Sequence, residues 1–334
     1  MKVGLSYDLK EEVSSDTIDA DDALEEYDST ETVNIIKEAL ESVGHKVIML
    51  GGGKDFLDRI TAIEVDIVFN IAEGRGSYRS REAQVPAILE MLGIPYSGSD
   101  PQCLAICLDK PLTKILAKSA GIPTAPWIIV KDEDYLTRDD WRNFRFPAIV
   151  KPAYEGSSKG VRSTSLVYNH AKARAEACKL LNSYRQPVMV EEFIDGDEVT
   201  AGITGNSPPS ILGIMRVIPR EKSEHFVYSL EVKRDWERLV DYECPAELGQ
   251  ETLKKITENS LKIFRVLGCR DFTRIDFRVG HDGVPYFLEI NPLPGLGTYS
   301  DLVIMAKKVG WTHHELITAV LDAALKRYPQ FVCV

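Results

Sequence analysis

The chain has 334 residues, of which 44% are hydrophobic, 27% charged and 8% aromatic, the balance of a globular protein that can bury sizeable cores. This composition excludes intrinsic disorder as the main state. No apolar run approaches the ~20 residues of a membrane-spanning helix, and residues 1–8 turn acidic without the apolar core of a signal peptide. We therefore expect a cytoplasmic protein with no membrane partner.

Acidic residues concentrate near the N-terminus. The formal net charge is −11, and residues 11–31 hold ten acids with no Lys or Arg. The rest of the chain is nearly neutral and has no basic stripe of the kind that binds nucleic acid, so DNA and RNA are not expected as partners. We interpret the acidic segment as a solvated loop, with a lid over a substrate as the alternative.

The six cysteines show no C-x-x-C spacing and no pairing with histidines that would indicate zinc. Structural thiols in a reducing compartment are the simplest interpretation. Cys103 and Cys107 lie four residues apart in an apolar stretch of helical character, where buried cysteine is common, and a redox role for the pair is the alternative.

Strands and helices alternate in the first third of the chain. Strands are predicted at 2–6, 46–50 and 66–70, and helices at 30–43 and 81–92, each helix followed by a glycine. The strand at 66–70 is nearly all apolar, as expected for a strand that is buried on both faces. Residues 1–97 are therefore predicted to form an α/β domain with a parallel sheet.

Two further pieces of chain follow. In 98–186 we predict helices at 110–120 and 169–183 and strands at 148–151 and 161–167. In 187–334 we predict strands at 188–193, 199–205, 211–217, 272–279 and 284–290, with helices at 251–267 and 311–327, a grouping typical of an α+β domain. No low-complexity linker separates the pieces, so they are expected to pack directly, with a site between them.

The first motif begins with a lysine at the end of a predicted strand. Lys151 is followed by a Gly/Ser turn at 156–160, whose backbone N–H groups can surround phosphate oxygens. The spacing is neither that of a Walker A loop nor that of a dinucleotide-binding turn. A plain hairpin tip is the alternative.

The second motif, at 191–198, places paired acids around Phe193 and Ile194 at the end of an apolar strand. Carboxylates can accept hydrogen bonds from an adenine amino group or from ribose hydroxyls, and the apolar pair can form a floor under a base. An acidic turn at a strand end is the alternative.

The third motif spans two predicted neighbouring strands. Period-two alternation places Arg274, Asp276 and Arg278 on one face of the first strand, and Glu289 and Asn291 on one face of the second. If the short turn at 280–283 pairs these strands, three oxygen ligands converge in the way that Mg²⁺ prefers. A surface charge ladder is the alternative, and the metal interpretation depends on all three motifs occurring in order.

In this order the motifs resemble those of the ATP-grasp superfamily, and within it the D-alanine:D-alanine ligase branch, over essentially the whole chain. The supporting runs are FNIAEG (69–74), LGIPYSGS (92–99), LDK (108–110), KP (151–152), EGSSKG (155–160) and EINPLPG (289–295). The resemblance implies three domains, an N-terminal α/β domain (1–97), a central subdomain (98–186) and a C-terminal α+β subdomain (187–334), with ATP between the last two.

The resemblance also implies roles for individual residues. Those implied for ATP are Lys110, Lys151 and Lys233 at the phosphates, Ser157, Ser158 and Gly160 in the closing loop, and Glu191, Glu192, Phe193, Ile194 and Glu198 at the base and ribose. Those implied for one or two Mg²⁺ ions, with Mn²⁺ as an alternative, are Asp276, Glu289 and Asn291. Those implied for catalysis and substrate are Arg274 and the backbone N–H of Gly295 at the developing oxyanion, Ser157, Ser300 at the carboxylate of the second amino acid, and Glu73.

The chemistry implied by the resemblance is the joining of two amino acids. The family transfers the γ-phosphoryl group of ATP to a carboxylate, and an amine then displaces phosphate from the acyl phosphate. D-Alanyl-D-alanine is the leading product, which would place the protein in peptidoglycan biosynthesis, and a homodimer is a further family expectation. Two alternatives stay open, namely a related ligase that makes another dipeptide or amide and a nucleotide-binding module without turnover.

Four departures from the branch concern amino-acid recognition. The N-terminal Gly-Gly-x-Ser-x-Glu loop, whose acid meets an ammonium group, is missing, and an acid of 11–28 is a possible substitute. Glu73-Gly74 stands where the branch often has His-Gly, and three arginines follow within 75–81, which could receive an extra acidic group. Arg234 and Asp301 stand where a tyrosine and an apolar residue are usual. These departures favour a chain that keeps the reaction and changes the substrate.

Overall fold

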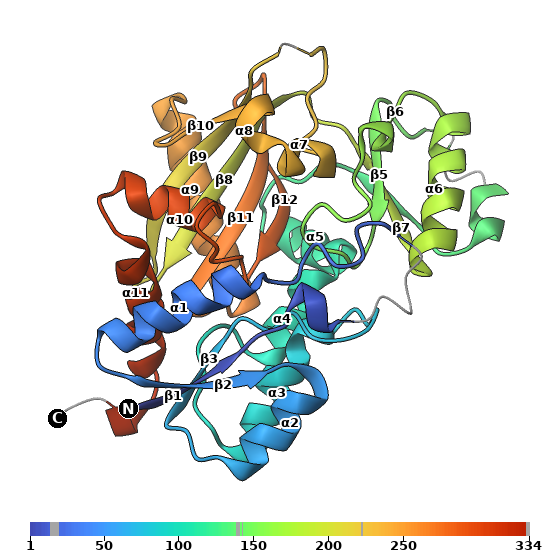
Figure 1. Ribbon diagram of the computed structural model, residues 1–334. Helices are drawn as coiled ribbons and strands as arrows, with labels where there is room; N and C mark the ends of the chain where they lie inside the picture. The colour runs from blue at the N-terminus through green and yellow to red at the C-terminus, as the bar shows by residue number, and fades with distance from the viewer. Residues whose placement is uncertain (14–19, 138–140, 142, 222, 332–334) are drawn as a thin grey trace.

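The computed structural model describes residues 1–13, 20–137, 141, 143–221 and 223–331. Within these ranges the strands form three sheets, which Figure 1 shows at the bottom, the upper right and the upper left of the molecule. Helices cover each sheet, and the three layers meet near the centre. Short 3₁₀ turns, among them η1 (Lys10–Glu12), η3 (Glu133–Thr137) and η6 (Pro329–Phe331), lie in the connections.

The first sheet is parallel, with the order β2-β1-β3, and consists of β1 (Lys2–Ser6), β2 (Lys46–Gly51) and β3 (Ile67–Asn70). All of β3 is buried, which confirms the parallel sheet that its apolar sequence predicts. The flanking helices are α1 (Thr30–Ser42), α2 (Gly53–Ala62) and α3 (Gln84–Leu92), of which α2 is absent from the predicted elements. The predicted helix at 81–92 begins with a 3₁₀ turn, η2 (Arg81–Ala83).

The second sheet is antiparallel, with the order β4-β7-β5-β6, and α6 (His170–Tyr184) packs on it. Its strands are β4 (Trp127–Val130), β5 (Ala148–Pro152), β6 (Leu166–Val167) and β7 (Val188–Glu192). The predicted strand at 161–167 is wrong for most of its length, because a 3₁₀ turn, η5 (Ser163–Ser165), precedes the two residues that pair with β5. The grouping of 188–193 with the later strands is also wrong, since β7 pairs with β4 and β5. An apolar run indicates a strand but not its partner.

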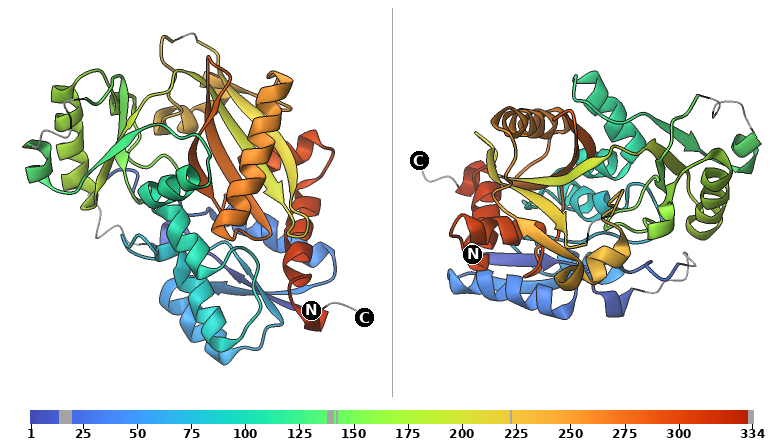
Figure 2. Two further views of the ribbon diagram at one scale, coloured as in Figure 1. Left: turned by 180° about the vertical axis from the view of Figure 1, so that it is seen from behind. Right: turned by 90° about the horizontal axis from the view of Figure 1, so that it is seen from above.

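The third sheet has the order β10-β9-β8-β11-β12 and is antiparallel. Its strands are β8 (Gly196–Thr204), β9 (Ser210–Pro219), β10 (Val240–Glu243), β11 (Phe272–Gly280) and β12 (Pro285–Asn291). α9 (Gln250–Leu267) covers one face, and α10 (Asp301–Lys308) and α11 (His313–Leu325) lie on the other, as Figure 2 shows from behind. Gly202 of β8 permits the close approach of α10, because a Cβ there would lie 2.6 Å from Leu302 Cδ2.

Helices connect the three layers. α1 packs against α11, so Ile36 and Leu40 share one apolar cluster with Phe69 of β3 and Leu302 of α10. α4 (Pro101–Leu108) and α5 (Lys110–Ser119) contact β12 and lead from the first sheet into the second, while α7 (Leu230–Arg234) and α8 (Trp236–Leu239) precede β10. No helix in the described part of the chain is both long enough and apolar enough to cross a membrane.

The two cysteines of α4 are buried, in agreement with their apolar context. Cys269, which follows α9, joins them: its Sγ lies 3.5 Å from that of Cys103, which lies 3.8 Å from that of Cys107. The three side chains pack in the apolar cluster between α4, α9 and the third sheet. Their spacing in sequence does not indicate this group, since Cys269 is 162 residues from Cys107.

Candidate active site

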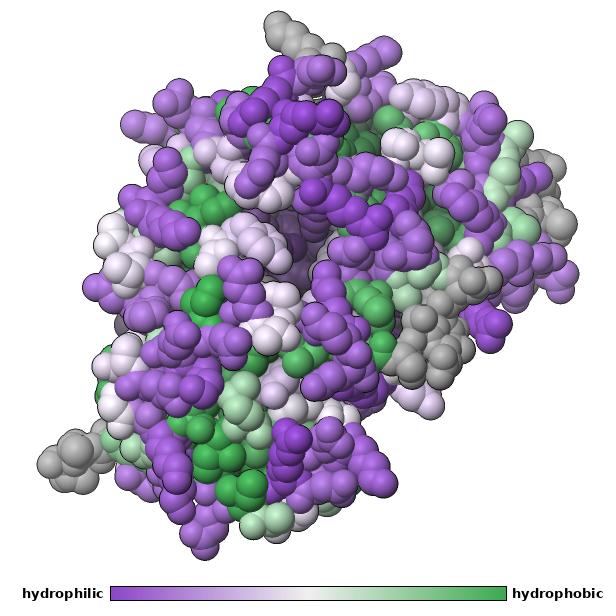
Figure 3. Space-filling model, viewed as in Figure 1, coloured by the Kyte–Doolittle hydropathy of each residue, from purple (hydrophilic) through white to green (hydrophobic). Residues whose placement is uncertain are grey.

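A cavity opens between β5 and β7 of the second sheet and β8, β11 and β12 of the third. Its volume is about 920 Å³ when the open solvent at its mouth is included. The face in Figure 3 is hollowed near its centre, in front of β12. The predicted site residues that line this first cavity are Lys110, Lys151, Ser158, Glu191, Glu192, Phe193, Ile194, Glu198, Lys233, Arg274, Asp276 and Glu289.

The third motif forms a hairpin on one side of this cavity. β11 and β12 pair through the turn at 280–283, with Asp276 opposite Glu289 and Arg274 opposite Asn291. Asn291 Nδ2 donates a hydrogen bond to Asp276 Oδ2 (3.2 Å), and Thr200 Oγ1 donates one to Asp276 Oδ1 (2.7 Å). Two carboxylates and a carboxamide therefore converge, a set of hard oxygen donors that fits Mg²⁺.

Positive groups surround these two carboxylates, but they outweigh the effect of burial on the pKa of only one of them. Lys110 Nζ lies 3.1 Å from Glu289 Oε2, and Arg274 bridges Asp276 (3.0 Å) and Asp301 (3.1 Å). Burial raises the pKa of Glu289, but the nearby cations, first of them Lys110, outweigh it and hold that pKa well below its usual range. Burial raises the pKa of Asp276, and Arg274 does not fully offset it. A divalent cation at this position would stabilise both carboxylates in their ionised form.

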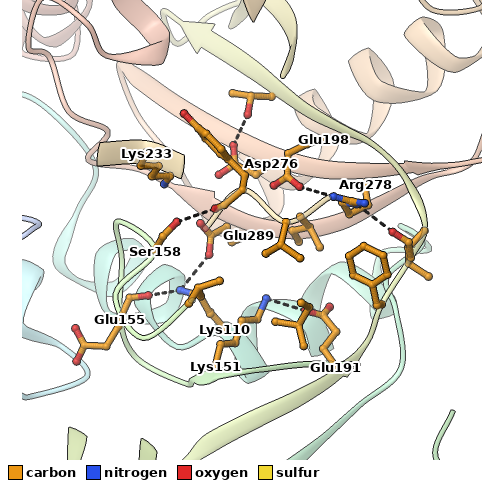
Figure 4. Close-up of a pocket in the computed structure, with 18 of the residues that line it drawn as sticks. Lys110, Lys151, Glu155, Ser158, Glu191, Glu198, Lys233, Asp276, Arg278 and Glu289 are labelled. Atoms are coloured by element: carbon orange, nitrogen blue, oxygen red, sulfur yellow. Dashed lines mark hydrogen bonds and ion pairs between the residues drawn. The ribbon is translucent and has the colours of Figure 1, made fainter. Parts of the chain in front are cut away.

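Three lysines reach the first cavity from different elements, and Figure 4 shows them around its centre. Lys110 at the start of α5 donates to the backbone carbonyl of Glu155, and Lys151 at the end of β5 lies 2.7 Å from Glu191 Oε2. Lys233 on α7 makes no ion pair with any described residue, although its Nζ lies over a tyrosine ring. Burial and then the Arg274 guanidinium lower the pKa of Lys233. A cation in this position is matched by an anionic ligand such as phosphate.

The second motif lines the opposite end of the cavity. Glu191 is only 3% exposed and pairs with both Lys151 and Lys114, and these two ammonium groups outweigh burial and lower the pKa of Glu191. Glu198 accepts a hydrogen bond from Arg278 (2.7 Å), whose guanidinium lies 4.7 Å from the centre of the Phe193 ring. Charged and aromatic groups therefore line this end of the cavity.

The sequence assigns no role to Lys114 or Arg278, although Lys114 pairs with Glu191 and Arg278 lines the first cavity. Arg278 lies on the same face of β11 as Arg274 and Asp276, so the period-two alternation already indicated that it faces the site. Lys114 is four residues after Lys110 on α5, and this helical spacing was its only local signal. Its burial against Glu191 depends on the tertiary fold, because α5 and β7 come from distant parts of the chain.

The Gly/Ser turn after β5 has a strained backbone. Ser157 and Ser158 have φ of 50° and 59°, in the left-handed region that non-glycine residues rarely adopt. Gly160 has φ of 71°, and a Cβ there would lie 2.4 Å from Pro152 Cγ, so only glycine fits. Ser158 lines the first cavity, whereas the N–H of Gly160 lies away from it and donates to Asp22 Oδ2 (2.9 Å).

The acidic N-terminal segment packs against this turn. Asp22 is fully buried and pairs with Arg162 (3.0 Å), while Glu26 pairs with Arg81 (2.5 Å) and Lys159 (3.1 Å). The solvated-loop interpretation is therefore wrong for residues 20–28, because buried carboxylates here match buried cations that are distant in sequence. Residues 14–19 of the segment lie outside the described residues.

A second cavity adjoins the first on the side of the first sheet. Lys110, Arg274 and Glu289 line both cavities and form a shared wall between them. Ser300 lines neither, although its Oγ lies 3.3 Å from the position of a Cβ built on Gly295. The predicted site residues that line only the second cavity are Glu73, Ser157, Asn291 and Gly295.

The three arginines of 75–81 already hold carboxylates of the protein. Arg75 pairs with Asp8 (2.9 Å) and Arg79 with Asp109 (3.2 Å), and the buried Arg81 pairs with the acidic segment as described above. None of the three lines either cavity. This arrangement argues against the alternative in which these arginines receive an extra acidic group of a substrate.

Fold and site together define an ATP-grasp ligase. The family model described as D-ala D-ala ligase C-terminus matches residues 116–322, more than half of the chain. The chain is 34% identical to the D-alanine–D-alanine ligase of Aquifex aeolicus over 302 residues, which cover 88% of this chain and 94% of that protein. It is also 34% identical to the uncharacterised protein y4sG of Sinorhizobium fredii over 301 residues, covering 87% and 86%.

A solved structure agrees with these sequence comparisons. The D-alanine–D-alanine ligase from Bacillus anthracis, complexed with ATP, matches with a TM-score of 0.77 and 25% identity over 98% of each chain. The present chain therefore belongs to the D-alanine:D-alanine ligase family.

Proposed function

We propose that this protein is an ATP- and Mg²⁺-dependent ligase that joins two amino acids through an acyl phosphate and releases ADP and phosphate. The observation that carries the proposal is the shared wall, since Lys110, Arg274 and Glu289 line both cavities. A γ-phosphate in the first cavity and a carboxylate in the second would meet there. D-Alanyl-D-alanine is the leading product, supported by the names of the relatives from Aquifex aeolicus and Bacillus anthracis.

The first step activates the donor amino acid. Its carboxylate oxygen attacks the γ-phosphorus, the bond to the bridging oxygen breaks, and ADP leaves with that oxygen. Lys110, Lys151 and Lys233 neutralise charge on the transferring group, mainly through their positions. Mg²⁺ held by Asp276, Glu289 and Asn291 would supply further positive charge at the phosphate oxygens.

The second step forms the amide bond. The neutral amine of the acceptor attacks the acyl carbon, phosphate leaves with the C–O bond electrons, and the amine nitrogen loses a proton. We assign the developing oxyanion to Arg274 and the N–H of Gly295, which line the second cavity. Ser157, in the strained turn, is assigned to closing over the reacting groups, and Ser300 to the acceptor.

The remaining assignments concern the nucleotide. We assign Glu191, Glu192, Phe193, Ile194 and Glu198 to the base and ribose, and Ser158 to the phosphates. Gly160, whose N–H is bonded to Asp22, is assigned to shaping the loop that carries Ser158. Because Glu191 is held between two lysines, we assign it to fixing their positions as well as to the base.

The test is ATP-dependent phosphate release by the purified protein with Mg²⁺, across D- and L-amino acids singly and in pairs, with products identified by mass. Turnover with D-alanine alone supports the leading product. Turnover only with another pair supports a ligase with an altered substrate. Nucleotide binding without turnover on any pair would support the non-catalytic alternative and overturn the proposal.

Three further expectations are kept as proposals. We propose one domain for each sheet, with the last boundary moved from residue 187 to the connection between β7 and β8, since β7 lies in the second sheet. A cytoplasmic location and a homodimer remain family expectations. Light scattering of the purified protein tests the second.

A further inference from the structure

The second cavity has an excess of negative charge. Its lining, as far as the chain is described, contains four glutamates and two cations. Both cations already have carboxylate partners, Lys110 in Glu289 and Arg274 in Asp276 and Asp301. The lining glutamates are Glu26, Glu73, Glu82 and Glu289.

Two of these glutamates have no partner among the residues that the structure describes. Glu26 is paired with Arg81 and Lys159, so it is not available to a ligand. By contrast, neither Glu73 nor Glu82 has a hydrogen bond or an ion pair with any residue that the structure describes. Glu82 lines the cavity and yet is only 8% exposed. A buried carboxylate without a partner is unfavourable unless a proton or a ligand cation neutralises it.

The local backbone brings the chain at Glu73 close to the chain at Glu82. Gly74 has φ of 82°, and a Cβ there would lie 2.0 Å from the carbonyl oxygen of Arg81, so the residue after Glu73 touches the residue before Glu82. The N–H of Gly74 donates to Asp8 Oδ2 (2.9 Å). The guanidinium of Arg81 bonds to Glu26 and to Tyr154 O and does not line the cavity, whereas its neighbour Glu82 does.

The electrostatics agree with this geometry. Burial, with Glu82 as the next cause, raises the pKa of Glu73 well above its ordinary value. Burial raises the pKa of Glu82 to about 7, although Arg81 opposes the shift. Without a cation beside it, the pair therefore favours a bound proton, and a ligand cation would take the place of that proton.

We propose that Glu73 and Glu82 bind the ammonium group of the amino acid whose carboxylate is phosphorylated. The proposal rests on the proposed function and names the binding residues of its donor. The donor carboxylate lies at the shared wall, beside Lys110 and Arg274, and its ammonium group extends into the acidic part of the second cavity. Glu82 thereby replaces the acid of the missing N-terminal loop, and Glu26 holds the strained turn through Lys159.

The test isolates the donor step. Hydroxylamine traps an acyl phosphate as a hydroxamate, so ATP-dependent hydroxamate formation measures activation of D-alanine without an acceptor. Propionate has the same carboxylate and lacks the ammonium group. The variants are Glu82→Gln and Glu73→Gln, and the control is Glu64→Gln, whose side chain is 97% exposed on the first domain.

The wild type and Glu64→Gln should prefer D-alanine over propionate strongly. Each site variant should raise KM for D-alanine about tenfold or more, because a charge-assisted bond is lost, and should narrow the preference over propionate by a similar factor. The Kd for ATP should stay unchanged. A structural role alone would lower the rates with D-alanine and propionate equally.

The outcomes separate the two proposals. If the wild type forms no hydroxamate from any amino acid of the panel, the proposed function fails. If the wild type is active and both variants prefer D-alanine over propionate as strongly as it does, the proposed ammonium site is wrong. The proposed ligase function is then unaffected. Should one variant fail to fold by circular dichroism, the other decides.

Discussion

Arg274 has two carboxylate partners, and this arrangement bears on the choice of acceptor. Asp276 is a proposed Mg²⁺ ligand, and Asp301 is the first residue of α10. A helix N-terminus and a guanidinium both attract anions. Here the Asp301 carboxylate already lies at the N-terminus of α10 and pairs with the Arg274 guanidinium. An acceptor carboxylate near Ser300 would therefore meet a negative neighbour where the family usually has an apolar side chain.

Asp301→Asn tests this effect. Removing the charge should lower KM for an acceptor with a free carboxylate about fivefold, since two unit charges about 4 Å apart in water interact with on the order of 1 kcal/mol. KM for D-alaninamide as acceptor should change little. Steady-state kinetics with both acceptors measure the difference, with the exposed Asp58→Asn as control. Equal changes for the two acceptors would contradict a charge effect.

Glu289→Gln tests the metal assignment. Glu289 is a proposed Mg²⁺ ligand and the partner of Lys110, so its loss should reduce Mg²⁺-dependent turnover about 100-fold or more. The readout is phosphate release against Mg²⁺ concentration. Glu258→Gln on α9, with a side chain 63% exposed, should behave as the wild type. Wild-type rates in Glu289→Gln would refute the assignment.

At the scale of elements, the turn between β5 and β6 is where sequence and packing are most tightly linked. Its left-handed residues Ser157 and Ser158 are unfavourable on their own. Lys159, 2% exposed, anchors the turn by pairing with Glu26 and Glu155 (2.6 Å). The turn is therefore held by its neighbours and not by its own conformational preference.

Two glycines with the same backbone conformation provide a matched pair of variants. Gly160 (φ 71°) faces Pro152, whereas Gly93 (φ 67°) ends α3 with nothing within 4 Å of a Cβ. Gly93→Ala should lower the free energy of unfolding by about 1 kcal/mol, because alanine is unfavourable in the left-handed conformation. Gly160→Ala should cost about 2 kcal/mol more, since the rigid proline ring must move. Urea unfolding measures the loss of stability in each variant. Equal losses would mean that Pro152 can move away from the added Cβ at no measurable cost.

At the scale of the whole molecule, buried ion pairs tie the N-terminal segment to the second sheet. Burial raises the pKa of Glu26, but Arg81 and Lys159 outweigh it, so the pKa lies below the ordinary 4.5. A carboxyl group with a lowered pKa in the folded state stabilises that state fully above its unfolded pKa. This stabilisation is lost as the pH falls from about 4.5 through the lower folded value.

Glu26→Gln should therefore lose stability at neutral pH and little at acid pH. At pH 7 the free energy of unfolding should fall by about 3 kcal/mol, because two buried cations lose a partner. The difference from the wild type should shrink as the pH drops below 4.5, where wild-type Glu26 becomes protonated. Urea unfolding at several pH values measures it, with the exposed Glu11→Gln as control. A difference independent of pH would contradict the ionic explanation.

The local patterns of the chain were sufficient for the elements whose contacts are close in sequence. The hairpin of β11 and β12 follows from period-two alternation and a short turn, and these two features already predict that Asp276 and Glu289 share one face. The same holds for the buried strand β3 and for α1, whose Ile36 and Leu40 lie on one helical face. The order of the motifs then sufficed to indicate the family.

The tertiary structure alone decided which distant groups meet. β7 joins the second sheet, Cys269 contacts Cys103 of α4, and Glu26 pairs with Lys159. Glu82 lines the second cavity without a partner in the described part of the chain. Nothing in the local sequence indicates these arrangements. Alternation and helical spacing report which face of an element is apolar, because they repeat within a few residues. They do not report the partner of that face, since a contact between residues more than 100 positions apart depends on how all the elements pack. For this protein, the sequence by itself determined the reaction class, and the folded chain decided the charges that surround its substrates.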